Sequence, residues 1–203
     1  MFGDVFSDKN KFKKMKIKEV ARIVSGSTPS TSNISYWNGN INWITPAELD
    51  DKTMFYGATE RKITEEGVKK ASLEIMPIGT VLFTTRAPIG KVGITIEEMS
   101  CNQGFKNCIC NKELLNNIYL YYLLKLNKEK FEKYGSGSTF QEISKTTFEN
   151  ISIAIPNIEL QNKFSRIIQL IDKQKFELEK QKQNYIDLKK GLMQQLLTGK
   201  LNV

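Results

Sequence analysis

The most regular pattern of apolar and polar positions lies in the C-terminal part of the chain. Alternating steps of three and four residues select a mostly apolar row there: Phe164, Ile167, Ile171, Gln174, Leu178, Gln181, Tyr185, Leu188, Leu192 and Gln195. Lys, Gln, Asn and Glu dominate the positions between them. This spacing predicts one long amphipathic helix with a coiled-coil seam, which a single helix cannot bury by itself. We therefore expect a partner helix, from this chain or from a second copy; an ordinary core helix is the alternative.

Shorter patterns occupy the rest of the chain. Runs of β-branched and apolar residues predict strands at 41–45, 79–85, 92–96, 105–110 and 151–155, and residues 16–24 alternate in part. Helices are predicted at 64–71 and 117–126. Small polar residues form loops at 26–33 and 135–139. The fold class is therefore α+β: a lead-in (1–14), a domain of mixed short strands and helices (15–156) and a long coiled-coil arm (157–203).

Composition narrows the possible partners and the compartment. The sequence has 30 Lys+Arg against 22 Asp+Glu, a formal charge of +8, which suits a polyanion such as DNA or RNA. A lysine-rich proteome is the alternative explanation, since Asn and Ile are also abundant. No run of about 18 apolar residues suggests a membrane span, and the N-terminus lacks a signal-peptide pattern, so we expect a cytoplasmic protein.

Catalytic and metal-binding patterns are scarce. The chain has no histidine, no phosphate-binding glycine loop and no adjacent prolines of the kind that DNA methyltransferases carry. Asp51, Glu60 and Lys62 fit a nuclease-like spacing, but this short pattern is common by chance. The three clustered cysteines, at 101, 108 and 110, favour buried strand positions over a disulfide framework or a zinc site. We expect no enzymatic activity, metal or cofactor.

Several short motifs follow one another in a specific order. They are Gly-Ser-Thr-Pro at 26–29, Tyr-Trp-Asn-Gly at 36–39, Trp-Ile-Thr-Pro at 43–46, Ile-Thr-Glu-Glu-Gly at 63–67, Pro-Ile-Gly-Thr-Val-Leu at 77–82, Arg-Ala-Pro-Ile-Gly at 86–90, Asn-Gln-Gly at 102–104 and Gly-Ser-Gly-Ser-Thr at 135–139. Pro156, Gln161 and residues 188–200 continue the series. Together they resemble the DNA specificity subunits of type I restriction–modification systems. Leu160 departs from the family pattern, which usually has Glu before the Gln at 161, and so does Asn202, where a basic residue is common.

The resemblance implies sequence-specific recognition of double-stranded DNA. Such a subunit reads one half-site of a bipartite target and leaves the chemistry to docked modification (methyltransferase) and restriction subunits. Family members resemble a tandem of two units whose helices pack antiparallel, whereas this chain carries one unit. We expect either a half-subunit or the C-terminal half of a longer protein. A homodimer through Phe164, Ile167, Ile171, Leu178, Tyr185, Leu188 and Leu192 would restore the helix pair.

The polar loops at 27–33, 84–91 and 136–141 are the best candidates for contacting DNA. The predicted DNA-binding residues are Arg86, Lys91, Ser27, Thr28, Ser30, Thr31, Arg61, Lys62, Lys106, Ser136, Ser138 and Thr139. Arg86, directly after a strong strand, is the leading candidate for reading a guanine; a structural ion pair is its alternative. The other basic residues are candidates for phosphate contacts or plain surface charge. Trp37, Trp43, Tyr121 and Tyr122 are predicted to pack in the interior. The rival function is a coiled-coil scaffold with an incidental basic surface.

Overall fold

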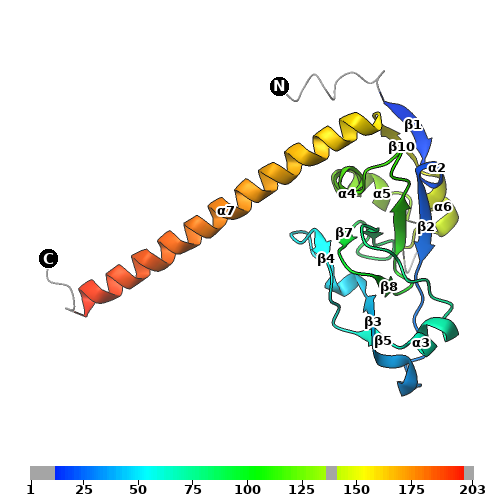
Figure 1. Ribbon diagram of the computed structural model, residues 1–203, viewed down its shortest axis with the longest axis horizontal. Coiled ribbons are helices and arrows are strands. Elements are labelled where there is room, and N and C mark those ends of the chain that lie inside the picture. The colour runs from blue at the N-terminus through cyan, green and yellow to red at the C-terminus, as the bar shows by residue number, and fades with distance from the viewer. Residues whose placement is uncertain (1–11, 136–140, 199–203) are drawn as a thin grey trace. The chain divides into compact units, whose positions relative to one another are not determined.

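The computed structural model describes residues 12–135 and 141–198 (Figure 1). In chain order its elements are β1 (Lys13–Lys16), α2 (Ile17–Val20), β2 (Ala21–Ser25), η2 (Ile34–Tyr36), β3 (Trp37–Ile44), η3 (Pro46–Glu48), β4 (Phe55–Tyr56), β5 (Lys62–Ile63), α3 (Glu65–Lys70), β6 (Val81–Phe83), β7 (Val92–Thr95), β8 (Met99–Cys101), β9 (Lys106–Cys110), α4 (Asn117–Leu126), α5 (Lys128–Glu132), α6 (Lys145–Asn150), β10 (Ser152–Ile155) and α7 (Ile158–Leu197). The chain divides into two compact units, Met1–Asn162 and Lys163–Val203.

Short strands of the first unit form three sheets among the described residues. The five-stranded sheet has the order β2-β9-β6-β7-β4, and only its β4–β7 pair is parallel. A three-stranded sheet, β5-β3-β8, pairs β3 with β8 in parallel. The antiparallel pair β1–β10 lies at the opposite end of this unit from β3, β5 and α3 (Figure 1). The predicted α+β class is confirmed.

The core of the first unit joins the two larger sheets. One cluster of buried side chains comprises Val24, Ile44, Leu49, Met76, Leu82, Met99, Cys101 and Phe105. The rings of Phe83, Phe131 and Phe148 form a second contact group, with centroids 5.1–6.2 Å apart. Burial of large side chains such as these, each worth about 1.5–3 kcal/mol, stabilises the platform from which the polar loops extend.

Local signals account for the best-predicted elements. Helix α4 occupies the predicted residues 117–126 and begins where the Asn116 side chain accepts a hydrogen bond from the Tyr119 N–H. Thr64 caps α3 in the same way through the Gly67 N–H. Strand β10 ends at Ile155, directly before Pro156, which cannot donate to a sheet. Tyr121 is buried as expected, with 2% exposure.

The N-terminal part of the chain differs from the prediction in two ways. The partial alternation at 16–24 is divided between the short helix α2 and strand β2, because Ile17 and Val20 are three residues apart and both point inward from one helical turn. Strand β1 begins at Lys13, inside the predicted lead-in, because it pairs with β10. Residues 1–11 of that lead-in lie outside the described part of the chain.

The second unit is described through residue 198 and consists of the greater part of α7. This helix is 40 residues long, which confirms the predicted long C-terminal helix. None of the helices within the described residues is long and apolar enough to cross a bilayer.

Candidate nucleic-acid interface

The polar loop after β2 is fixed to the sheet at its first residues. The Ser27 N–H donates to the carbonyl oxygen of Cys101 over 3.1 Å. A Cβ at Gly26 would lie 2.0 Å from the carbonyl oxygen of Asn102, so this close approach of two backbones requires glycine. Beyond this point the predicted residues Thr28, Ser30 and Thr31 are exposed.

Two tryptophans donate hydrogen bonds to the backbone of the loop at 26–33. Trp43 Nε1 donates to the carbonyl oxygen of Ser27, and Trp37 Nε1 donates to that of Ser30, each over 3.1 Å. The two indoles pack edge to face, with centroids 5.1 Å apart and planes at 86°. Trp43 is buried as predicted, whereas Trp37, which was also predicted to pack in the interior, is half-buried.

Arg61 lies over the ring of Trp37. Its guanidinium carbon lies 3.7 Å from the Trp37 ring centroid and 5.3 Å from that of Trp43, within the range of a cation–π contact. Arg61 is exposed, and the adjacent Lys62 is also exposed because Ile63, the next residue of β5, takes the buried position. The fold therefore brings Arg61 next to the predicted Ser27–Ser30 part of the loop.

Residues 102–104 connect this loop to the turn that follows β6. Thr28 Oγ1 donates to Gln103 Oε1, and the carbonyl oxygen of Gly104 accepts from the Thr85 N–H over 2.8 Å. Gln103 was not among the predicted site residues. The Asn-Gln-Gly motif at 102–104 was the available signal for it.

Arg86 and Lys106 share one carboxylate. Arg86 Nε lies 2.9 Å from Glu142 Oε2, and Lys106 Nζ lies 3.4 Å from Glu142 Oε1. The Arg86 side chain is 46% exposed, whereas that of Lys106 is 8% exposed. Arg86 thus adopts the ion pair that was its alternative role. A phosphate contact by Lys106 is not supported by its position, because its amine is buried and paired.

Lys91 also makes structural contacts. Its Nζ donates to the backbone carbonyl oxygens of Pro46 and Leu49, the first of these over 3.3 Å. These contacts hold η3 against the β6–β7 turn. They also occupy the Lys91 amine, which was a candidate for a phosphate contact. The predicted residues Ser136, Ser138 and Thr139 lie outside the described residues.

The predicted seam of α7 carries several exposed apolar side chains. Ile171, Leu178, Tyr185, Leu188 and Leu192 are 46–72% exposed. Phe164 and Ile167 are half-buried. Most of the apolar side chains of the predicted seam are therefore exposed to solvent in the single chain.

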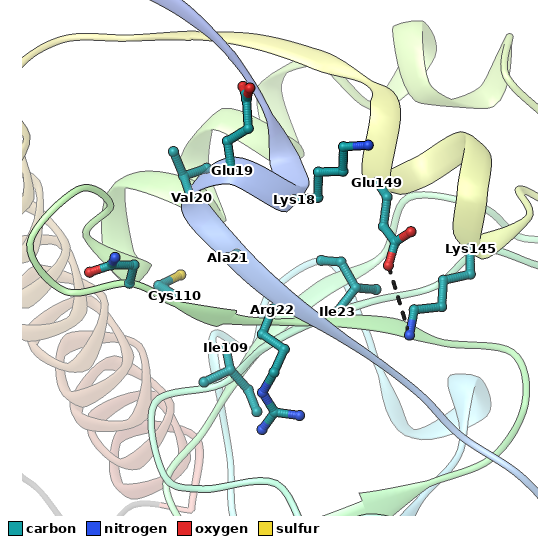
Figure 2. Close-up of a pocket in the computed structure, with 11 residues that line it drawn as sticks. Lys18, Glu19, Val20, Ala21, Arg22, Ile23, Ile109, Cys110, Lys145 and Glu149 are labelled. Carbon is teal, nitrogen blue, oxygen red and sulfur yellow. Dashed lines mark ion pairs between the residues drawn. The ribbon is translucent and has the colours of Figure 1, made fainter.

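A separate open hollow of the first unit lies beside β2 (Figure 2). It is lined by Lys18, Glu19, Val20, Ala21, Arg22, Ile23, Ile109, Cys110, Asn111, Lys145 and Glu149. Its charges are largely compensated: Arg22 pairs with Glu74 at 2.6 Å and Lys145 with Glu149 at 3.8 Å. None of the predicted DNA-binding residues lines it, so we assign it no ligand.

The cysteines have the strand positions that the sequence favoured. Cys101 lies in β8, and Cys108 and Cys110 lie in β9; all three are free thiols. Burial raises the pKa of Cys101 and that of Cys110 to about 12 and raises the pKa of Cys108 well above its ordinary value. Among the described residues, no three His, Cys, Asp or Glu side chains are grouped to hold a metal ion.

Comparison with known proteins gives consistent matches. The family model described as "Type I restriction modification DNA specificity domain" matches residues 9–188. The type I restriction enzyme MjaIX specificity subunit of Methanocaldococcus jannaschii is 41% identical over 160 residues, which cover 77% of this chain and 37% of that protein. The HindI specificity subunit of Haemophilus influenzae is 21% identical over 190 residues, covering 91% of this chain and 40% of that subunit.

Solved structures share the fold at low sequence identity. A chain from a type I R-M system studied for its complex assembly aligns with a TM-score of 0.69 at 21% identity, over 93% of this chain and 45% of that one. The HsdS subunit of Thermoanaerobacter tengcongensis aligns with a TM-score of 0.63 at 19% identity, over 84% of this chain and 39% of that one. The present chain thus spans less than half the length of these relatives. Because the family model covers most of its length, the chain belongs to the type I restriction modification DNA specificity family.

Proposed function

We propose that the chain recognises one half-site of a bipartite double-stranded DNA target in a type I restriction–modification system. The observation that carries this proposal is the match of the DNA specificity domain to residues 9–188. The chain supplies the sequence reading, and separate modification and restriction subunits supply methyl transfer and cleavage.

The exposed polar loop and its neighbours support DNA as the ligand. Trp37 contacts both Ser30 and Arg61, and Thr28 and Thr31 are exposed in the same loop as Ser30. The exposed Lys62 follows Arg61 in the chain. Hydroxyl and basic side chains are the usual partners of phosphates and base edges. The formal charge of +8 adds a long-range attraction for a polyanion.

A binding experiment tests this role directly. The full chain is titrated against a pool of randomised duplexes, and the bound fraction is sequenced. We expect one enriched half-site and an affinity that falls steeply between about 50 and 200 mM salt, as phosphate contacts release counterions. Binding without sequence preference would refute the proposal, and absence of salt-dependent DNA binding would favour the coiled-coil scaffold.

Docking of the modification subunit is proposed for α7. Apolar side chains outside the predicted seam are exposed as well, namely Phe176, Ile186, Met193 and Leu197. One partner helix covers only one side of α7, so these residues fit contact with a further protein. The chain alone should transfer no methyl group from S-adenosylmethionine to DNA. Methyl transfer by the purified chain would refute this division of labour.

A homodimer through α7 completes the proposal. In an antiparallel pair Ile171 faces Leu188 and Ile167 faces Leu192, while Gln174 faces Tyr185. This register pairs apolar side chains at Ile171–Leu188 and Ile167–Leu192, and it places a glutamine against an apolar or aromatic side chain at the other seam positions. Two copies of this chain would then supply the antiparallel pair of helices that tandem family members are expected to form within one chain.

The dimer has a distinctive expected dependence on salt. In the same register Lys175 of one copy lies beside Lys182 of the other, so salt should strengthen dimerisation by screening the repulsion between them. Light scattering at tens of micromolar should report a dimer, with a larger dimer fraction at about 200 mM than at about 50 mM salt. The double variant Ile171→Glu, Leu188→Glu should be folded and monomeric. A monomer at every salt concentration would refute the homodimer.

A further inference from the structure

Ile34 is an apolar side chain presented at the tip of a well-held turn. It opens the 3-10 turn η2 and is 79% exposed. Single exposed apolar residues are ordinary on protein surfaces, so exposure alone assigns no role to Ile34. The surroundings of the turn are what distinguish it.

Hydrogen bonds from two sides fix the backbone of η2. The Asn33 side chain accepts from the Ser35 N–H over 3.1 Å. Thr64 donates from Oγ1 to the Ser35 carbonyl oxygen over 2.8 Å and from its N–H to the Tyr36 carbonyl oxygen over 3.0 Å. The first turn of α3 packs closely against it, because a Cβ at Gly67 would lie 2.6 Å from the Tyr36 carbonyl oxygen. Ile34 therefore stands on a rigid support.

The stacked arginine lies at the other end of this turn. The Trp37 N–H donates to the Ile34 carbonyl oxygen and closes η2, and the Trp37 ring carries Arg61 at 3.7 Å. The other arginines of this unit, Arg22 and Arg86, pair with glutamates. Within residues 12–135 and 141–198, no carboxylate forms an ion pair with Arg61.

A guanidinium stacked on an indole is prepared for planar recognition. Its ring contact uses the face of the group, so the N–H donors at its edge remain directed to the sides and can bond two acceptors at once. Guanine offers such a pair of acceptors, O6 and N7, in the major groove. A neighbouring apolar side chain matches the methyl group of thymine there.

We propose that Arg61 and Ile34 form one reading head that contacts base edges in the major groove, Arg61 at a guanine and Ile34 at a thymine methyl. This inference rests on the proposed DNA-recognition function and assigns specificity to two residues within it. A pure phosphate site would gain nothing from the exposed apolar Ile34. The adjacent Lys62, a flexible point charge, is better suited to a phosphate.

Two conservative variants separate base reading from charge attraction. Arg61→Lys keeps the charge and loses the planar fork. Ile34→Ser replaces the apolar side chain by a shorter, polar one and so loses the apolar contact. Lys62→Gln is the matched control, because it removes a charge at the next residue. Each full-length variant is tested by the same selection from randomised duplexes, and its thermal melt verifies that it is folded.

The expected changes are local in the recognised sequence. Arg61→Lys should reduce discrimination at one G·C position by about tenfold to a hundredfold, and Ile34→Ser at one A·T position by about three- to tenfold. One 3-10 turn is about 6 Å long, so these positions should lie within about two base pairs of each other. Lys62→Gln should weaken binding to all sequences alike.

Three results would overturn the reading head. Equal weakening of all sequences by Arg61→Lys would make Arg61 a phosphate contact, and an unchanged preferred site in both variants would place base reading elsewhere. Relaxed positions far apart would separate the two residues. If the unaltered chain has no sequence preference, the proposed DNA recognition itself fails, which distinguishes that failure from the failure of this inference.

Discussion

Glu142 is the side chain whose alteration tests the candidate interface most directly. It bridges Arg86, the residue that the sequence favoured for base reading, and Lys106, whose side chain is 8% exposed. Glu142→Gln removes the negative charge with little change in shape. We expect it to destabilise the domain, because Lys106 would keep a buried positive charge without its counter-ion.

The structure sets the size of the effect. Breaking a buried ion pair from one side costs about 3–5 kcal/mol, and the half-exposed Arg86–Glu142 contact adds at most about 1 kcal/mol. The Gln side chain still accepts hydrogen bonds, so we expect a net loss of roughly 2–4 kcal/mol in the free energy of unfolding. At about 2–4 °C per kcal/mol for a chain of this size, Tm should fall by roughly 5–15 °C.

Urea denaturation of matched variants measures this loss. Glu149→Gln is the control: it breaks the long Lys145–Glu149 contact of 3.8 Å, in which the Lys145 amine belongs to a half-exposed side chain, and should cost less than about 0.5 kcal/mol. The double variant Glu142→Gln, Lys106→Met should regain much of the lost stability, since no buried charge then remains. If Glu142→Gln is as stable as the unaltered protein within about 0.5 kcal/mol, the reasoning from buried charge is wrong.

Two further predictions concern buried polar groups. Gln161 is fully buried, donates to the carbonyl oxygens of Leu114 and Pro156 and accepts from the Asn116 N–H. Gln161→Ala should therefore lower the free energy of unfolding by about 2–4 kcal/mol in chemical denaturation. The control Gln141→Ala changes an exposed residue and should alter that free energy little. Because burial raises the pKa of each thiol, the reactive thiolate is scarce until the pH approaches these raised values, so iodoacetamide at about pH 8 should label Cys101, Cys108 and Cys110 only after denaturation. Mass spectrometry counts the labelled thiols, and labelling of the native chain at the rate of a free cysteine would contradict that account.

Elements set by local signals could be predicted from the sequence. Helix α4 follows from its apolar run and from Asn116 as its cap, and α7 follows from a periodic row that no proline interrupts after Pro156. Each predicted strand lies in place, but its ends were less accurate, and β1, β4, β5 and β8 were not predicted. For example, residues 79–85 form a strand only at Val81–Phe83, because the residues on either side make hydrogen bonds to turns and loops.

The interface was harder to predict because its contacts join distant parts of the chain. Lys106 and Arg86 look like surface charges until the fold brings Glu142 between them, 36 and 56 residues away along the chain. Arg61 has no local signal for its stack on Trp37, which depends on the pairing of β5 with β3. The sequence identified the loop at 27–33, since its composition alone distinguishes it.

The tryptophan contacts beneath that loop bear on how the target sequence of such a protein can change. Trp43 and Trp37 bond the carbonyl oxygens of Ser27 and Ser30, and Cys101 bonds the Ser27 N–H, so these anchors depend on the loop's backbone and not on its side chains. Side chains at 30–32 can therefore be exchanged without removing these backbone bonds, although the Ser30–Ser32 side-chain hydrogen bond would be lost. The proposed DNA contacts of this loop can therefore be tested by single mutations that leave these backbone bonds intact.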